Sequence, residues 1–306
     1  MSLDELKNGT VSELTNKPEN NYTSILVLRE LESNAVFTTN GVDADIGTIA
    51  IEDSEYNPVL MFMRKQSGSD RRYGKSMQRE LLEDVECTMN VNEMCQKCPE
   101  CVLFGSAASK GDYDISITSR VMYDTAYSLR DSNVVVEEKF QNAPGDSYSK
   151  KATAGIREPD FVLPGTMFPC VITLRDATPE ELAFVLAITL KNKRYGATSS
   201  RQGRTKNHIL GIYQGNEEPA SNLAITKKTI NKLGDANEIT KRDTISIDKA
   251  KKAVKQSFDE ILKQEKIDME EIDNTKDILN EVRENIGEYL KNQKEVSNQF
   301  IENQVN

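Results

Sequence analysis

Residues 167–214 read MFPCVITLRDATPEELAFVLAITLKNKRYGATSSRQGRTKNHILGIYQ and hold the clearest local order in the chain. Apolar and β-branched side chains over 167–175 predict a strand. We expect a helix over 178–192, a glycine-rich loop over 195–205 and a second strand over 208–214. The segment therefore predicts a β-α-loop-β unit.

Three residues mark the start of this helix. Thr178 is a natural N-cap, Pro179 occupies the first helical position, and Glu181 lies three residues after the cap. At this spacing the Thr and Glu side chains can each accept a hydrogen bond from the other residue's backbone N–H, an arrangement known as the capping box. We therefore expect the helix to begin directly after Thr178.

Shorter patterns surround this unit. Apolar and β-branched runs predict strands at 23–31, 47–53, 59–64 and 114–123. A loop rich in Gly, Ser and Asp at 67–70 precedes a short helix expected over 75–86. Residues 134–165 read as two extended arms around a polar tip.

The composition changes near residue 243, where Lys, Glu, Asp and Asn become frequent. Apolar residues recur there at helical spacing, at Ala250, Val254, Phe258, Ile261, Ile278, Val282, Ile286 and Leu290. This pattern predicts two amphipathic helices that dock on the body or on a neighbouring subunit. The chain is thus expected to comprise a polar N-terminal tail (1–22), a body (23–240) and an acidic helical tail (241–306).

The composition is that of a folded protein. Of the 306 residues 37% are apolar and 29% charged, which suffices for a sizeable core. No run approaches the roughly 18 to 20 apolar residues of a membrane span, and the start lacks the order of a signal peptide. We expect a cytoplasmic protein with no membrane partner. His208 is the only histidine, which excludes catalysis by two histidines, and we expect it to be structural.

The net charge of −10 hides two positive islands. Residues 61–80 carry six basic and two acidic side chains, and residues 191–210 carry six basic and no acidic ones. Local potential governs contact with a polyanion more than the total charge does. The candidate nucleic-acid contacts are Arg64, Arg71, Arg72, Lys75, Arg79, Arg194, Gly196, Ser199, Ser200, Arg201, Gly203, Arg204 and Lys206.

The loop RYGATSSRQGRTK, residues 194–206, is suited to hold phosphodiesters. Its glycines allow close backbone approach, its serines can donate hydrogen bonds, and its arginines can form charge-assisted bonds to phosphate oxygens. The alternative is a solvated, flexible loop. No segment matches the aromatic RNA-reading motif of standard RRM domains, so we expect phosphate-led binding that tolerates any sequence.

Four of the five cysteines crowd into a short insertion, and only Cys170 lies apart. Two-residue spacing lets neighbouring thiolates converge on one tetrahedral ion, which favours structural zinc over an iron–sulfur cluster or unligated thiols. Four sulfur ligands leave no position for water, so catalysis at this metal is not expected. The candidate ligands are Cys87, Cys95, Cys98 and Cys101.

Two other patterns suggest chemistry. Gly68 followed by Gly74-Lys75-Ser76 approaches a phosphate-binding P-loop, but five residues separate the glycines where four are required. Such a site would bind ATP through Lys75. Loop carboxylates can also hold Mg²⁺, although they more often form turns, and they occur at Asp43, Asp45, Asp112 and Asp114.

The order of these features resembles a known family. A basic helix at 75–86, the cysteine insertion, Cys101-Val-Leu-Phe104-Gly105, the strand SRVMYDTAYSL, an extended arm, and the loop from Gly196 to Gly203 follow one another. The sequence is similar to the Cas-seven backbone subunits of type I-D CRISPR interference complexes, the Csc-two family. The similarity runs from about 23 to 215, and KATAGIREPDFVLPGTMFPCVITLRDATPEEL is its most family-like text.

The resemblance implies an α+β fold, namely a modified ferredoxin-like RRM core with inserted zinc-bearing (about 84–104), finger and thumb (about 130–166) subdomains and a C-terminal helical extension. Copies of the chain would form a filament on a CRISPR RNA that pairs with a target nucleic acid, beside other subunits of the complex. The guide backbone would contact Lys75, Arg79, Ser199, Ser200, Arg201 and Arg204. A non-enzymatic binder is expected, with a metal-dependent nuclease of the same fold as the alternative and an NTPase as a weaker one. Deleting 241–306 is expected to affect assembly or solubility more than RNA affinity.

Overall fold

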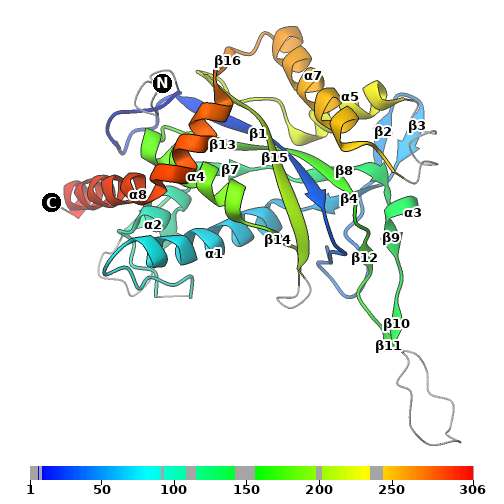
Figure 1. Ribbon diagram of the computed structural model, residues 1–306, viewed down its shortest axis with the longest axis horizontal. Helices are drawn as coiled ribbons and strands as arrows, with labels where there is room; N and C mark the ends of the chain where they lie inside the picture. Colours follow the sequence, from blue (N-terminus) through cyan, green and yellow to red (C-terminus); the bar gives the residue numbers. More distant parts are fainter. Residues whose placement is uncertain are drawn as a thin grey trace, which may run out of the picture.

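An antiparallel sheet forms the centre of the molecule (Figure 1). The computed structural model describes residue 6 and the ranges 9–90, 93–107, 115–141, 156–197, 202–234 and 244–305. Within them the strands follow the order β14-β15-β1-β13-β7, and β16 pairs with β15. Their bounds are β1 Tyr22–Leu31, β7 Val121–Tyr123, β13 Met167–Arg175, β14 Arg194–Tyr195, β15 Gly203–Gly215 and β16 Met269–Glu271.

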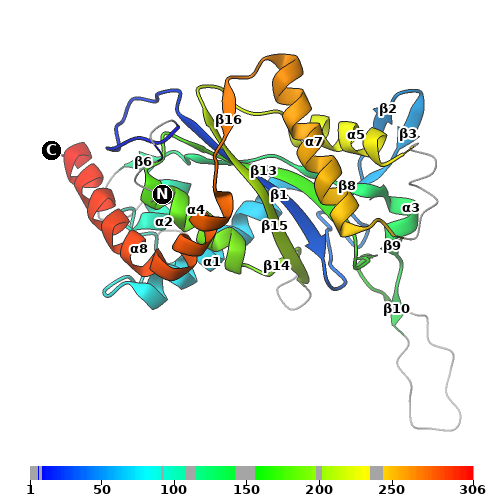
Figure 2. The same ribbon diagram turned by 45° about the horizontal axis from the view of Figure 1, so that its top comes forward.

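Strand β1 is buried along most of its length because both faces of the sheet are covered. Successive strand side chains point to opposite faces. Ile25 and Val27 accordingly enter one hydrophobic cluster, whereas Leu26 and Leu28 enter another. The helices on the first face are α1 Met63–Leu81, α4 Pro179–Lys191 and α8 Thr275–Val305, and those on the second are α5 Asn222–Leu233 and α7 Ile247–Glu265 (Figures 1 and 2).

The expected β-α-loop-β unit is confirmed. Strand β13 has the predicted bounds, and α4 begins at Pro179 after the Thr178 cap. The Glu181 backbone N–H donates to the Thr178 hydroxyl at 3.4 Å, and the Thr178 N–H donates to the Glu181 carboxylate at 3.1 Å. The following strand starts at Gly203, five residues earlier than expected, because its first residues pair with β14.

Helix α1 corrects two predictions. It runs from Met63 to Leu81, so the loop expected at 67–70 and the helix expected only from 75 are both wrong. Tertiary contacts outweigh the poor helix propensity of this segment. Gly74 permits close packing, because a Cβ there would lie 2.9 Å from Ile188 Cδ1. The P-loop reading fails as well, since backbone N–H groups inside a helix bond to its own carbonyls and cannot cradle phosphate.

Two short strand pairs extend away from the sheet (Figure 1). Strand β9 pairs with β12, and β10 pairs with β11, so the two extended arms predicted over 134–165 are confirmed from residue 136 onward. Val134 and Val135 belong instead to a short helix. The expected polar tip falls within 142–155, outside the described residues. The bounds are β9 Val136–Glu137, β10 Phe140–Gln141, β11 Ile156–Arg157 and β12 Phe161–Val162.

The remaining elements are short and lie around the sheet. A hairpin of β2 and β3 projects near α5, and β4 pairs with β8. Their bounds are β2 Ile49–Ile51, β3 Ser54–Tyr56, β4 Pro58–Met61, α2 Pro99–Phe104, β5 Ser106–Ala107, β6 Ser116–Ile117, β8 Ala126–Asp131 and α3 Ser132–Val135.

Both amphipathic helices predicted from about 243 are present as α7 and α8, and both dock on the body. Phe258 of α7 and Leu290 of α8 are fully buried in the two separate clusters. Helix α5 was not predicted, although Ser221 caps it by accepting from the Ala224 N–H at 3.2 Å. No described helix has the length and hydrophobicity needed to cross a membrane.

Candidate metal centre and nucleic-acid interface

The four clustered cysteines converge in the segment between α1 and α2 and in α2 itself. Their Sγ atoms all lie within 4.8 Å of one another, and three of the four side chains are buried. Cys98 caps α2, and Cys101 lies inside that helix, so two ligands are held by one short element. Cys95 and Cys98 donate backbone N–H groups to neighbouring sulfurs at 3.2 and 3.3 Å.

This donor set fits a tetrahedral metal ion such as zinc. Zinc–sulfur bonds of about 2.3 Å place tetrahedral ligands about 3.8 Å apart. The four sulfurs all lie within 4.8 Å of one another, and those of Cys87 and Cys101 are 3.5 Å apart. Backbone N–H groups directed at sulfur also stabilise thiolates, which are the metal-binding form. Among the described residues this is the only grouping of three or more Cys, His, Asp or Glu ligands.

Lys75 belongs to this centre and is not on the surface. Its side chain is buried, and Nζ lies 2.8 Å from the Cys87 sulfur, 3.0 Å from that of Cys101 and 2.6 Å from the Glu100 carboxylate. Burial would lower the pKa of Lys75, but Cys98, Glu100 and Cys101 more than offset it and keep the ammonium charged. The residue expected to hold guide phosphates therefore offsets the negative charge of the sulfurs.

Arg71 also faces inward. Its guanidinium pairs with Glu100, donates to the Gly105 carbonyl at 2.7 Å and lies 5.9 Å from the Phe104 ring centroid. Glu100 is not among the residues predicted from the sequence, yet it pairs with both Arg71 and Lys75. Its place directly before the last cysteine was the available signal.

Lys65 of the first island is also buried, but the other three cations remain exposed on α1. Arg64, Arg72 and Arg79 are solvent-accessible and recur at intervals of eight and seven residues, which places them along one side of the helix. Arg64 donates to the Thr39 hydroxyl, and Arg79 donates to the Cys87 carbonyl at 2.8 Å. Arg79 thus lies between the metal centre and solvent.

The second island forms the hairpin of β14 and β15. Arg194 and Arg204 are directly opposite in the register, so both side chains leave the same face of the hairpin, and both are exposed. Arg204 pairs with Glu32 at 2.8 Å on the surface, and Lys206 is exposed on the same strand. Surface ion pairs of this kind are weak, so the Arg204 guanidinium can leave Glu32 and bind another anion such as a phosphate.

The two glycines hold the hairpin against the body. Gly196 has φ +128°, and a Cβ there would lie 2.8 Å from the Val36 carbonyl oxygen. A Cβ on Gly203 would lie 2.4 Å from the Ala35 Cβ. The close approach of these two glycines is therefore to residues 35 and 36 of the same chain, where a larger side chain would not fit. Ser199, Ser200 and Arg201 lie outside the described residues.

The structure brings the two islands together. The Ser69 hydroxyl of α1 donates to the Arg194 carbonyl of β14, and the Asn192 amide donates to Asp70 of α1 at 2.8 Å. The hairpin is thereby anchored on the helix that carries the first island. We refer to Arg64, Arg72, Arg79, Arg194, Arg204 and Lys206 as the exposed cations.

Two of the four carboxylates proposed for Mg²⁺ pair with cations. Asp43 pairs with Arg157 at 2.8 Å, and Asp45 pairs with Lys65 at 3.5 Å. Asp112 and Asp114 lie outside the described residues. His208 lies 2.8 Å from Glu30, and burial lowers the pKa of its imidazole. These contacts fit the structural role expected for His208.

Comparison with known proteins identifies the family. A family model described as Csc2 Crispr matches residues 10–299. The chain belongs to the Csc2 CRISPR family. The resemblance inferred from the sequence is thus confirmed, and the match extends beyond residue 215 into the C-terminal helices of this Csc2 chain. None of the curated proteins matches it.

Solved structures share the fold of this Csc2 chain. The crystal structure of Thermofilum pendens Csc2 superposes with a TM-score of 0.62 at 16% identity, covering 94% of this chain and 90% of that one. A chain of a structure described as "CRISPR RNA-guided surveillance complex, pre-nicking" superposes with a TM-score of 0.50 at 8% identity, covering 88% of this chain and 100% of that one. At these identities the likeness concerns the fold.

Proposed function

We propose that this chain is a backbone subunit that binds the guide RNA of a type I-D CRISPR interference complex in the cytoplasm. Membership of the Csc2 family supports this role. The observation that carries it is the joining of two cationic islands, in which Arg194 and Arg204 stand side by side on a hairpin anchored to α1. A polyanion bound by these cations contacts both elements.

The mode of binding follows from the groups available. The exposed cations offer guanidinium and ammonium groups, which bind phosphate oxygens without reading bases. Helices α5 and α7 cover the second face of the sheet, so that face offers no open platform for base stacking. Bound through its backbone, the guide keeps its bases free to pair with a target, and sequence choice resides in the RNA.

We assign the central sheet to a modified ferredoxin-like RRM core. The order β15-β1-β13-β7 corresponds to the fourth, first, third and second strands of a β-α-β-β-α-β chain in which α1 and α4 are the crossover helices. The pairs β9–β12 and β10–β11 support the thumb assignment, and the cysteine segment supports the zinc-bearing insertion. Further copies of the chain and other subunits would complete the complex.

The metal is assigned as structural zinc. Four sulfur ligands fill a tetrahedral ion and leave no position for a reactive water. The nuclease alternative gains no support from the described carboxylates, because Asp43 and Asp45 are paired with cations. A non-catalytic role is therefore proposed.

The test replaces the two opposed arginines together. Arg194→Ala with Arg204→Ala removes two phosphate contacts, and each contact contributes about 0.7 to the log–log salt slope for a single strand. We expect weaker binding to every RNA sequence and a salt slope shallower by about 1.4. Binding is measured with labelled single-stranded RNA over a series of salt concentrations.

The matched control removes two exposed cations from α7, Lys252→Ala with Lys263→Ala, and so changes the net charge equally. It is expected to leave the slope unchanged. Equal effects of the two double variants, or an unchanged slope for the arginine pair, would count against the proposed interface.

A further inference from the structure

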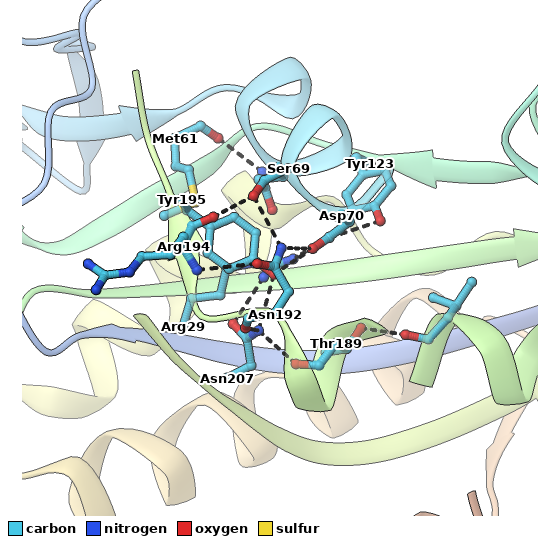
Figure 3. A network of polar contacts seen from close by, with 12 residues as sticks. Arg29, Met61, Ser69, Asp70, Tyr123, Thr189, Asn192, Arg194, Tyr195 and Asn207 are labelled. Atoms are coloured by element: carbon cyan, nitrogen blue, oxygen red, sulfur yellow. Dashed lines mark hydrogen bonds and ion pairs between the residues drawn. The ribbon is translucent and has the colours of Figure 1, made fainter. Parts of the chain in front are cut away.

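Asp70 is a fully buried carboxylate in the middle of α1, at the centre of a polar network (Figure 3). Its Oδ1 accepts from the Tyr195 hydroxyl at 2.6 Å and from the Asn192 amide at 2.8 Å. Its Oδ2 accepts from the Tyr123 hydroxyl at 3.0 Å and from the Arg29 guanidinium at 3.4 Å. A buried charge is costly without such partners, and here four side chains satisfy it.

Two of these four partners come from the first end of the basic hairpin. Asn192 ends α4 immediately before β14, and Tyr195 lies in β14. Asn207, on the returning strand β15, donates to the Tyr195 hydroxyl at 3.1 Å and to the Asn192 carbonyl at 3.2 Å, and accepts from Arg29 at 3.0 Å. The network therefore joins both ends of the hairpin to each other and to α1.

The Tyr195 hydroxyl remains protonated and can donate a hydrogen bond. Burial raises the pKa of its hydroxyl well above the ordinary value, so the proton remains in place. The Arg29 guanidinium lies 4.3 Å from the centroid of its ring, which fixes the ring independently of the hydroxyl. The hydroxyl donates its proton to Asp70 and accepts a hydrogen bond from Asn207, so it links the carboxylate of α1 to strand β15.

We propose that Asp70 and Tyr195 are positioning residues that hold the basic hairpin in its RNA-binding position. The inference rests on the proposed function, because it assigns to the network the preorganisation of that interface. Neither side chain reaches solvent, so neither can contact RNA directly. Each acts through Arg194 and Arg204, the cations next to the network in the chain and across the hairpin.

The physical basis is the cost of ordering a loop on binding. A hairpin held in the competent geometry before RNA arrives binds without that cost. If the hairpin opens, the apparent affinity falls by the fraction of molecules that remain competent. No cation is lost in this case, so the number of phosphate contacts, and with it the salt slope, stays the same.

The experiment compares two substitutions that each remove one hydroxyl from the same carboxylate. Tyr195→Phe removes the bond from the hairpin, and Tyr123→Phe removes the bond from β7, outside the hairpin. For Tyr195→Phe we expect about a tenfold loss of affinity for single-stranded RNA with an unchanged salt slope. We also expect faster hydrogen exchange in the peptide covering 193–206. Tyr123→Phe is expected to change the RNA affinity and the hydrogen-exchange rate of this peptide by less than twofold.

The outcomes separate this inference from the proposed function. A selective effect of Tyr195→Phe on affinity and exchange supports the positioning role. Equal effects of the two variants, with wild-type RNA binding intact, would show that the network only stabilises the fold and would overturn the inference alone. A wild-type chain that does not bind RNA would overturn both.

Discussion

If the cysteines hold zinc as proposed, replacing Cys98 with serine is expected to release that zinc and to destabilise the whole chain. Zinc binding by structural sites is worth about 10–16 kcal/mol in small zinc-finger peptides, so even a partial loss is large beside a typical folding free energy of about 5–15 kcal/mol. Leu103 and Phe104 lie three or fewer residues from Cys101 and are buried in the main hydrophobic cluster. Loosening the metal segment therefore disturbs the core.

We expect the melting temperature to fall by about 10 °C, which corresponds to a loss on the order of 3–5 kcal/mol in a chain of this size. If only the metal-binding segment loosened, the melting temperature of the whole chain would stay the same. The matched control is Cys170→Ala, which removes a buried thiol of β13 that lies outside the cluster. It is expected to retain zinc. The measurements are zinc per chain by elemental analysis and thermal unfolding.

A wild-type chain purified without zinc would remove the metal assignment. A Cys98→Ser chain that retained one zinc with an unchanged melting temperature would show that Cys98 is not a ligand.

The second large effect is expected at α8. Leu290 is fully buried in the cluster that also holds the apolar side of α4. Leu290→Ala is therefore expected to lower the free energy of unfolding by about 2–5 kcal/mol. Its neighbour Lys291 is exposed, and Lys291→Ala is expected to change that free energy by less than about 0.5 kcal/mol. Denaturant unfolding measures both.

Deleting residues 275–305 is expected to prevent folding. The deletion removes the buried side chains of α8, including Ile278, Val282 and Leu290, and exposes the apolar surface on which they pack. The sequence had suggested an effect on assembly or solubility. A truncated chain that unfolded at the same denaturant concentration as the full chain would contradict the integral role of α8.

The contrast between α4 and α1 shows how far the sequence leads. The signals for α4 are local, because Thr178 and Glu181 bond to each other's backbone, and the helix appears where the pattern predicts it. Helix α1 depends on distant partners instead. Asp70 is tolerated inside it because Arg29, Tyr195 and Asn192 converge on the carboxylate, and none of these lies near it in the chain.

The candidate site also contains one part that the sequence predicts and one that it does not. The spacing of the cysteines predicts their cluster, because metal ligands on short turns are close in sequence. The position of Lys75 was not predictable from its place in a basic segment, because only the folded chain shows Glu100 and the sulfurs around its ammonium. Charge counts identify the islands, but burial decides which cations face solvent.

The sheet also shows why the absence of an aromatic RNA-reading motif was informative. In this chain α5 and α7 pack on the face that carries Leu26 and Leu28, and these helices bury it. Aromatic side chains on that face would be covered by these helices and could not contact RNA. The interface that we propose lies instead at the edge of the sheet, where β14 and β15 lie next to α1.

The central claim is that RNA lies along α1 and the β14–β15 hairpin. Its most direct test is photo-crosslinking of the wild-type chain to single-stranded RNA that carries 4-thiouridine, with identification of the crosslinked peptides. We expect crosslinks in peptides from both 62–79 and 194–206. Crosslinks confined to α5 and α7, or to peptides from only one of the two islands, would contradict it.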